Sequence, residues 1–268
     1  MSELGTAVPT GGNIPAPDRG APAPPKPRSP VAEVGWALAS TAALLAWLTW
    51  QWGWVWAVAG MIGLLIHEVG HLLAINALGC GPGRIHVIPF LGGAATMKRP
   101  PRTVFDGVLI ALAGPLAGLL AAIPFIAASL MTDDPRWAGG AFFIVMINLL
   151  NLLPAPPLDG SKALGPALAW IHPMVERGAL VLVGGAAVLW ALQRGSLIFA
   201  TFVGIATLGS FRRGALRPEA ERLTGGQWLA ALALSAGVLA FGLVVLQLSV
   251  GGGGVTGVLG AIRRAGLQ

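Results

Sequence analysis

The stretch that decides the fold is WVWAVAGMIGLLIHEVGHLLAINAL, residues 54–78. It holds one formally charged residue, Glu68, and no Asp, Glu, Lys or Arg occurs at residues 34–66. An uncharged run of about 20 residues is long enough to cross the hydrocarbon core of a bilayer as a helix. Ionisable side chains at that depth cost free energy, so Glu68 and the two histidines beside it mark a candidate functional site.

The two histidines, His67 and His71, have the spacing of a metal-binding pair. Residues four apart lie on the same face of a helix, so both imidazoles can bind one ion. In the pattern HExxH, which reads HEVGH here, the histidines bind zinc and the glutamate acts as a general base. Catalytic zinc takes three protein ligands and keeps a fourth position open for water. A third ligand must therefore come from another part of the chain.

The composition indicates a protein that resides in the lipid bilayer. Hydrophobic residues make up 55% of the 268 residues and charged residues 10%, against roughly 25% charged in an average soluble domain. The net charge of +6 does not indicate nucleic-acid binding, because the basic residues fall in short clusters between apolar runs, as topology signals do. The single cysteine, Cys80, excludes an intrachain disulfide and a thiolate zinc site.

We predict an all-α polytopic membrane protein with about seven transmembrane helices. The predicted helices lie at about 33–50, 54–78, 105–131, from Trp137 to a proline-rich break, 178–193, 196–211 and 228–250. The predicted parts of the chain are a disordered Pro/Gly-rich cytoplasmic tail (1–32), a core (33–211), a charged cytoplasmic linker (212–227), an additional helix (228–250) and a Gly-rich tail (251–268).

The basic residues orient these helices in the cell membrane. Of the 17 Lys and Arg residues, the only ones predicted on one side are Arg136, Arg194, Arg263 and Arg264. Because cytoplasmic loops are enriched in Lys and Arg, the opposite side, which carries the N-terminus, is cytoplasmic. His67 lies about 20 Å along its helix from the outer surface, at 1.5 Å per residue. The metal site is thus predicted in the cytoplasmic half of the membrane.

Residues 84–96 are predicted to form an extended, membrane-associated hairpin, because the segment is too short and too glycine-rich to be a further span. The hairpin includes Gly92 and Gly93. It also includes His86, which is either an accessory metal ligand or a hydrogen-bonding residue at the membrane surface.

Asp159 is the best candidate for the third ligand. It follows a segment with three prolines in four residues, 154–157, where the helix must open. Open backbone at membrane depth has to face protein or a polar cavity. Asp106 is instead a predicted helix cap, because Thr103 completes a capping box with it. The residues predicted to bind one zinc ion, and the general base beside them, are His67, His71, Asp159 and Glu68.

Two motifs together resemble the site-2 protease family of intramembrane zinc metalloproteases, over residues 55–170. The first is HEVGH, and the second is NLLPAPPLDG at 151–160, which matches the family pattern NxxPxPxxDG at each position. The resemblance puts Asp159 on the family's third zinc ligand. It implies that Asn151 binds the substrate backbone or stabilises the oxyanion. Asn148, one turn earlier, either lines the same cavity or packs between helices.

The resemblance also implies a compact member with a six-helix core. The connections between helices leave no room for the PDZ or CBS domains that some members carry. The hairpin around Gly92 and Gly93 resembles the family's membrane-reentrant sheet, which would pair its edge strand with an unwound substrate.

The function implied is hydrolysis of a peptide bond within or next to a substrate's transmembrane segment, in regulated intramembrane proteolysis. The expected partner is a membrane-tethered regulator, such as an anti-sigma factor or a transcription factor. Two other functions stay open: a catalytically silent adaptor of the same fold that binds membrane segments, and a metal transporter with intramembrane His and Asp ligands. The four intact site residues favour an enzyme over an adaptor, and their predicted clustering at one depth disfavours a transporter.

Overall fold

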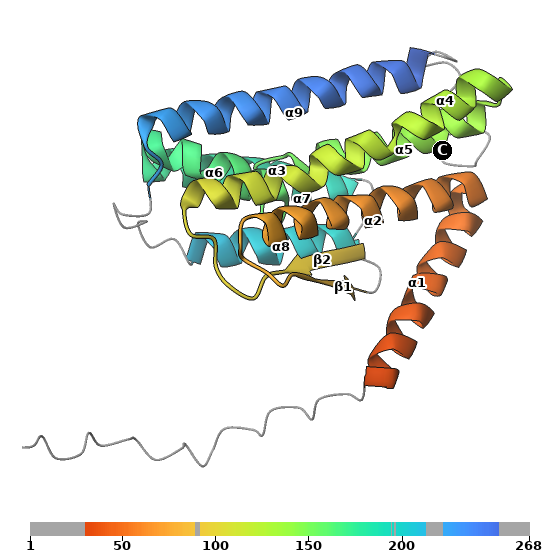
Figure 1. The fold of residues 1–268 in the computed structure, drawn as a ribbon, viewed down its shortest axis with the longest axis horizontal. Helices are drawn as coiled ribbons and strands as arrows, with labels where there is room; N and C mark the ends of the chain where they lie inside the picture. Colours follow the sequence, from red (N-terminus) through yellow and green to blue (C-terminus); the bar gives the residue numbers. More distant parts are fainter. Residues whose placement is uncertain (1–29, 89–91, 194, 196, 213–221, 252–268) are drawn as a thin grey trace, which may run out of the picture.

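The computed structural model describes residues 30–88, 92–193, 195, 197–212 and 222–251. These residues form a helical bundle with one β-hairpin (Figure 1). The elements are α1 (Pro30–Trp52), α2 (Trp54–Ala77), β1 (Arg84–Ile88), β2 (Gly92–Thr96), α3 (Val104–Ala121), α4 (Ile123–Thr132), α5 (Pro135–Asn151), α6 (Asp159–Ile171), α7 (Pro173–Gln193), α8 (Leu197–Arg212) and α9 (Gly225–Gly251). A mostly helical fold is confirmed. Most of the predicted tails and linker lies outside the described residues.

The helix with the HEVGH motif, α2, packs along both α3 and α5. Glycines make this approach close. A methyl group at Gly70 would meet the backbone carbonyl of Ala113 on α3, and one at Gly63 would lie 2.9 Å from the side chain of Ile144 on α5. Small residues at helix contacts let backbones come together where lipid provides no hydrophobic driving force. The motif is therefore held between two helices at short range.

The predicted helix at 105–131 consists of two helices, α3 and α4, which meet at Ala122. Pro124 stands in the first turn of α4, where its missing N–H cannot complete the helical hydrogen-bond pattern. The predicted capping box at the start of α3 is confirmed. The Asp106 N–H donates to Thr103 Oγ1 at 3.0 Å, and the Thr103 N–H donates to Asp106 Oδ2 at 3.1 Å.

The predicted break after Asn151 is present, and it separates α5 from α6. A separate helix at α6 was not predicted from the sequence. The chain turns back on itself here. A methyl group at Gly160 would collide with the carbonyl oxygen of Leu152, so only glycine allows this return. The turn places Asp159 in the first turn of α6, close to the end of α5.

The predicted hairpin is also present. β1 and β2 pair antiparallel, from Arg84 opposite Thr96 to Ile88 opposite Gly92, and β2 lies against α2. Its entry into the membrane stays a prediction.

Within the described part of the chain, four segments are long and apolar enough to cross a membrane: Trp54–Ala77, Val104–Thr132, Pro173–Gln193 and Gly225–Val250. These segments suit a membrane protein. The other predicted spans correspond to α1, α5 and α8, which are not among the four, so a count of seven stays a prediction. In Figure 1, α1 leaves the bundle at a steep angle to α2, whereas α9 runs along the bundle and packs on α3, α5 and α6.

Candidate metal centre

Three side chains from two helices converge inside the bundle. His67 and His71 come from the middle of α2, and Asp159 comes from the first turn of α6; they are 3%, 8% and 7% exposed. The Nε2 atom of each histidine lies 3.1 Å from Asp159 Oδ2. The two Nε2 atoms also lie 3.1 Å from each other. The structure therefore brings the three predicted ligand atoms to one point.

The other ring nitrogen of each histidine meets a hydrogen-bond acceptor. His71 Nδ1 lies 2.7 Å from the carbonyl oxygen of Ile110 on α3, and His67 Nδ1 lies 2.9 Å from Asn148 Oδ1 on α5. Oxygens of this kind only accept hydrogen bonds, so both Nδ1 atoms must carry the hydrogen. In a neutral imidazole the Nε2 atom then carries an unshared lone pair. Both histidines thus direct a lone pair at Asp159.

This donor set fits zinc. Two imidazole nitrogens and a carboxylate oxygen face one another at 3.1 Å, and three such acceptors repel unless a proton or a metal cation lies between them. Zinc–nitrogen and zinc–oxygen bonds of about 2.0–2.2 Å in a tetrahedron put ligand atoms roughly 3.3 Å apart, close to these separations. Among the described residues, His67, His71 and Asp159 are the one group of three or more His, Cys, Asp or Glu side chains with this geometry.

Glu68 lies next to the cluster in sequence and is 6% exposed. Its Oε2 atom is buried, and no hydrogen-bond partner for it occurs among the described residues. Burying a carboxylate oxygen without a hydrogen-bond partner in an apolar setting costs free energy on the order of several kcal/mol. A buried carboxylate oxygen without a partner among the described residues, next to a predicted ligand in sequence, suits the predicted role of Glu68 as a proton acceptor.

Helix α3 forms the wall behind the site. A methyl group at Gly114 would collide with the imidazole of His71, and one at Gly118 would collide with the amide of Asn148. These two glycines and Ile110 are spaced by four residues, so they share one face of α3. This face is shaped to receive the two side chains that approach it.

The remaining oxygen of Asp159 faces the outside of the cluster. Lys162 Nζ lies 3.7 Å from Asp159 Oδ1, and the Lys162 side chain is 66% exposed. This ion pair therefore joins a buried carboxylate oxygen to an exposed side chain.

The other predicted site residues lie in different settings. Asn151 is half-buried, and its Nδ2 donates to the backbone carbonyl of Ile147 at 3.1 Å. Gly92 and Gly93 lie on β2, paired with Ile88 and Val87. The side chains of residues 86–94 lie outside the described part of the chain. The substrate-binding roles of Asn151, Asn148, Gly92 and Gly93 therefore stay predictions.

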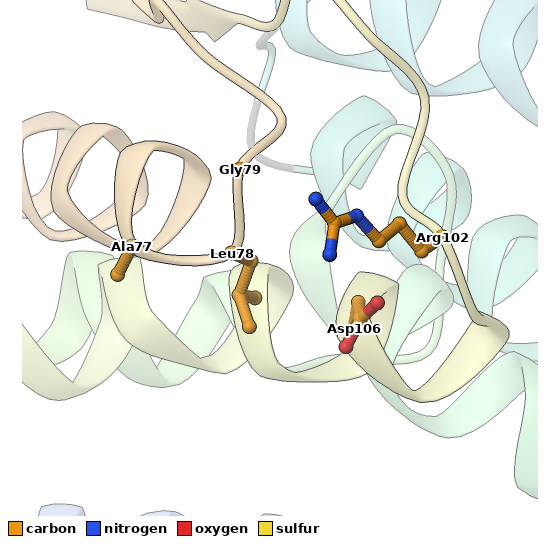
Figure 2. Close-up of a pocket in the computed structure, with 5 residues that line it drawn as sticks. All are labelled: Ala77, Leu78, Gly79, Arg102 and Asp106. Carbon is orange, nitrogen blue, oxygen red and sulfur yellow. The ribbon is translucent and has the colours of Figure 1, made fainter.

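A separate hollow of about 270 Å³ opens where α2 ends and α3 begins. Figure 2 shows the Arg102 side chain reaching toward Gly79, with Asp106 below it. Asp106 serves the capping box here, as predicted, and it does not join the metal cluster. The residues lining this hollow are Ala77, Leu78, Gly79, Arg102 and Asp106.

Sequence reasoning did not identify the partners of the ring Nδ1 atoms. The sequence left Asn148 either lining the cavity or packing between helices and did not pair it with His67. No residue pattern points to the backbone carbonyl of Ile110. One available signal was the four-residue spacing of Gly114 and Gly118, which is typical of a face where another element approaches closely.

Comparisons with known proteins found local similarity to zinc metalloproteases. A protein of Mycolicibacterium smegmatis named "Putative zinc metalloprotease Rip2" is 39% identical over 88 residues, which cover 30% of this chain and 34% of that protein. A protein of the same name from Mycobacterium tuberculosis is 46% identical over 67 residues, 22% of this chain and 26% of that protein. The match spans about a third or less of these relatives. No family model and no solved structure matches the chain.

Proposed function

We propose that this protein is a zinc-dependent intramembrane endopeptidase of the site-2 protease type. It cleaves a peptide bond within or next to a transmembrane segment of its substrate. The observation that carries the proposal is the convergence of the two histidine Nε2 atoms and Asp159 Oδ2. Glu68, next to His67 in sequence, adds a buried Oε2 atom with no hydrogen-bond partner among the described residues. The local similarity to zinc metalloproteases supports the same chemistry.

One zinc ion per chain, bound by His67, His71 and Asp159, would polarise the scissile carbonyl and activate a water molecule. Glu68 accepts the proton of that water and returns it to the leaving amine. Its side chain is buried, so bulk water has little access to the carboxylate.

Asn151 is the residue we assign to the substrate backbone. One hydrogen of its Nδ2 donates to Ile147 O within α5, which fixes the amide plane. The second Nδ2 hydrogen then supplies a donor to the oxygen that becomes negative in the transition state. This role follows from the motif resemblance together with the fixed amide.

The substrate we propose is a membrane-spanning protein, such as a membrane-tethered regulator in regulated intramembrane proteolysis. A helical peptide bond is shielded by its neighbours, so the substrate must unwind before cleavage. Among the described residues the two strands of the hairpin pair only with each other, so an outer strand edge is offered to the unwound segment. Gly92 and Gly93 carry no bulky side chains on that hairpin. We place the protein in the cell membrane with several spans, a cytoplasmic N-terminus and the active site in the cytoplasmic half.

The proposal is tested with the purified full-length protein in detergent, assayed for bound zinc and for cleavage of a model transmembrane substrate. Wild type is expected to hold one zinc ion per chain and to lose activity with a zinc chelator. Glu68→Gln is expected to keep the zinc and to cleave about 10²–10⁴-fold more slowly. Zinc binding without cleavage by wild type would instead support the silent adaptor. Zinc transport across vesicles without cleavage would support the transporter.

A further inference from the structure

The amide of Asn148 connects the metal centre to α5. Asn148 is fully buried, and its Oδ1 accepts a hydrogen bond from His67 Nδ1, although the two residues are 81 positions apart. Its Nδ2 donates to the backbone carbonyl of Ile144 at 2.8 Å. Because a carbonyl only accepts, this second bond fixes which end of the amide faces His67. The oxygen end faces the imidazole.

We propose that Asn148 is a positioning residue for the zinc site: it holds His67 as the Nδ1–H tautomer, with the Nε2 lone pair directed at the metal. The assignment rests on the proposed function, because it concerns a ligand of the proposed zinc ion. Outer residues that orient a ligating histidine typically change metal affinity by about 10- to 100-fold when they are removed. Asn148 thus contributes to zinc binding without contacting zinc or substrate.

The surface of α3 against which Asn148 packs also positions His67. A methyl group at Gly118 on α3 would collide with both terminal atoms of the Asn148 amide. One turn earlier Gly114 receives the His71 ring, and Ile110 supplies the acceptor for His71 Nδ1. One face of α3 therefore orients both histidines, directly for His71 and through Asn148 for His67.

The alternative reading is that Asn148 only packs α5 against its neighbours. Asn151 provides a matched control, because its Nδ2 also donates to the carbonyl four residues earlier, Ile147 O. The two residues share this backbone hydrogen bond and differ in the contact with His67. If the backbone bond were what matters, both asparagines would behave alike in a metal-binding assay.

The test measures zinc affinity of the full-length protein in detergent by competition with a chromophoric chelator, and the absorption spectrum of the Co²⁺-loaded protein. Asn148→Leu is expected to bind zinc about 10- to 100-fold more weakly and to shift the Co²⁺ spectrum. Asn148→Asp, which still offers an oxygen acceptor to His67, is expected to retain affinity close to that of wild type. Asn151→Leu is expected to leave the zinc affinity unchanged.

A second pair of variants approaches the contact from α3. Gly118→Ala is expected to weaken zinc binding as Asn148→Leu does, because the new methyl group displaces the amide. Gly242→Ala on α9 is the steric control, since its methyl group would press on Leu149 and Leu119 rather than on Asn148. It is expected to lower the Tm without changing the zinc affinity. The Tm of each variant, measured with and without zinc, separates an effect on the orientation of His67 from an effect on folding. A variant that disturbs only packing loses the same Tm in both conditions.

Equal zinc affinity for wild type, Asn148→Leu and Gly118→Ala would overturn the assignment and leave the proposed function standing. The same holds if Asn151→Leu weakens zinc binding as much as Asn148→Leu. Failure of the wild type to bind zinc at all would overturn the proposed function, and the assignment with it.

Discussion

The indole N–H of Trp228 on α9 donates a hydrogen bond of 3.0 Å to the backbone carbonyl of Ala167 on α6. The same indole stacks on Trp170 of α6, with ring centroids 4.7 Å apart. Because α6 begins with Asp159, these contacts tie the helix of the third ligand to α9. The helix expected to lie beyond the six-helix core is therefore packed against α6, the helix that carries the predicted third ligand.

Replacing Trp228 with Phe tests this connection. The variant keeps an aromatic ring and removes the N–H, so we expect a loss of about 1 kcal/mol in the free energy of unfolding. That loss corresponds to a Tm lower by about 2–4 °C in a chain of this size. Trp190→Phe, at a half-exposed position on α7, is the matched control. Equal Tm values for the two variants would argue against a specific role for the Trp228 bond.

Replacing Gly114 with Ala tests the wall of the site. Alanine favours a helix over glycine by up to about 1 kcal/mol, so an unconstrained glycine in α3 would yield a more stable protein. The new methyl group meets the His71 ring, and such overpacking costs about 1–3 kcal/mol. We expect lower stability and weaker zinc binding. Gly185→Ala, whose methyl group meets nothing within 4 Å, is the control. A gain in stability for Gly114→Ala would contradict the account.

The two oxygens of Asp159 are expected to differ in importance. Asp159→Asn removes the predicted anionic ligand, so the purified variant should no longer hold one zinc ion per chain. Lys162→Met removes the cation 3.7 Å from Oδ1, and because the Lys162 side chain is 66% exposed and screened by solvent, we expect the pair to contribute only about 0–1 kcal/mol. Zinc affinity should therefore change by less than about fivefold. The zinc content of the two variants, measured after dialysis, distinguishes these expectations. The expectation would be contradicted if Lys162→Met lost its zinc as completely as Asp159→Asn does.

The turn between α4 and α5 is expected to contribute acid-sensitive stability. Hydrogen bonds from the Arg136 side chain and backbone to Asp134 lower the pKa of this carboxyl below its ordinary value. The stabilisation is therefore present above the ordinary Asp pKa of about 3.9, and it is lost as the pH falls through the lowered value. Asp134→Asn keeps a capping side chain without the charge. The Tm advantage of wild type over this variant should disappear in acid; an advantage independent of pH would contradict the expectation.

Local patterns in the sequence predicted most helix positions. Uncharged runs located α2 and α9 to within a few residues, and the capping residues Thr103 and Asp106 located the start of α3, because these signals act within one turn of chain. The division of one predicted helix into α3 and α4 was missed. A proline in the first turn of a helix is tolerated, so Pro124 alone does not show where the preceding helix ends.

The convergence of His67, His71 and Asp159 could be predicted because each belongs to a short motif with its own chemistry. Their supporting partners could not. The contact between Asn148 and His67 depends on how α5 packs against α2, and the Ile110 acceptor is a backbone atom that any residue carries. Such contacts follow from the tertiary arrangement, which spacing along the chain does not encode.

The most direct test of the central claim maps the cleavage site in a bilayer. Wild type and Glu68→Gln are reconstituted in liposomes with a single-span substrate whose segment contains helix-weakening glycines, and the product masses are measured. We predict a cut within or next to the membrane segment by wild type, and a rate at least about 100-fold lower for Glu68→Gln at equal zinc content. Equal rates for the two proteins, or a cut far from the membrane segment, would contradict the account.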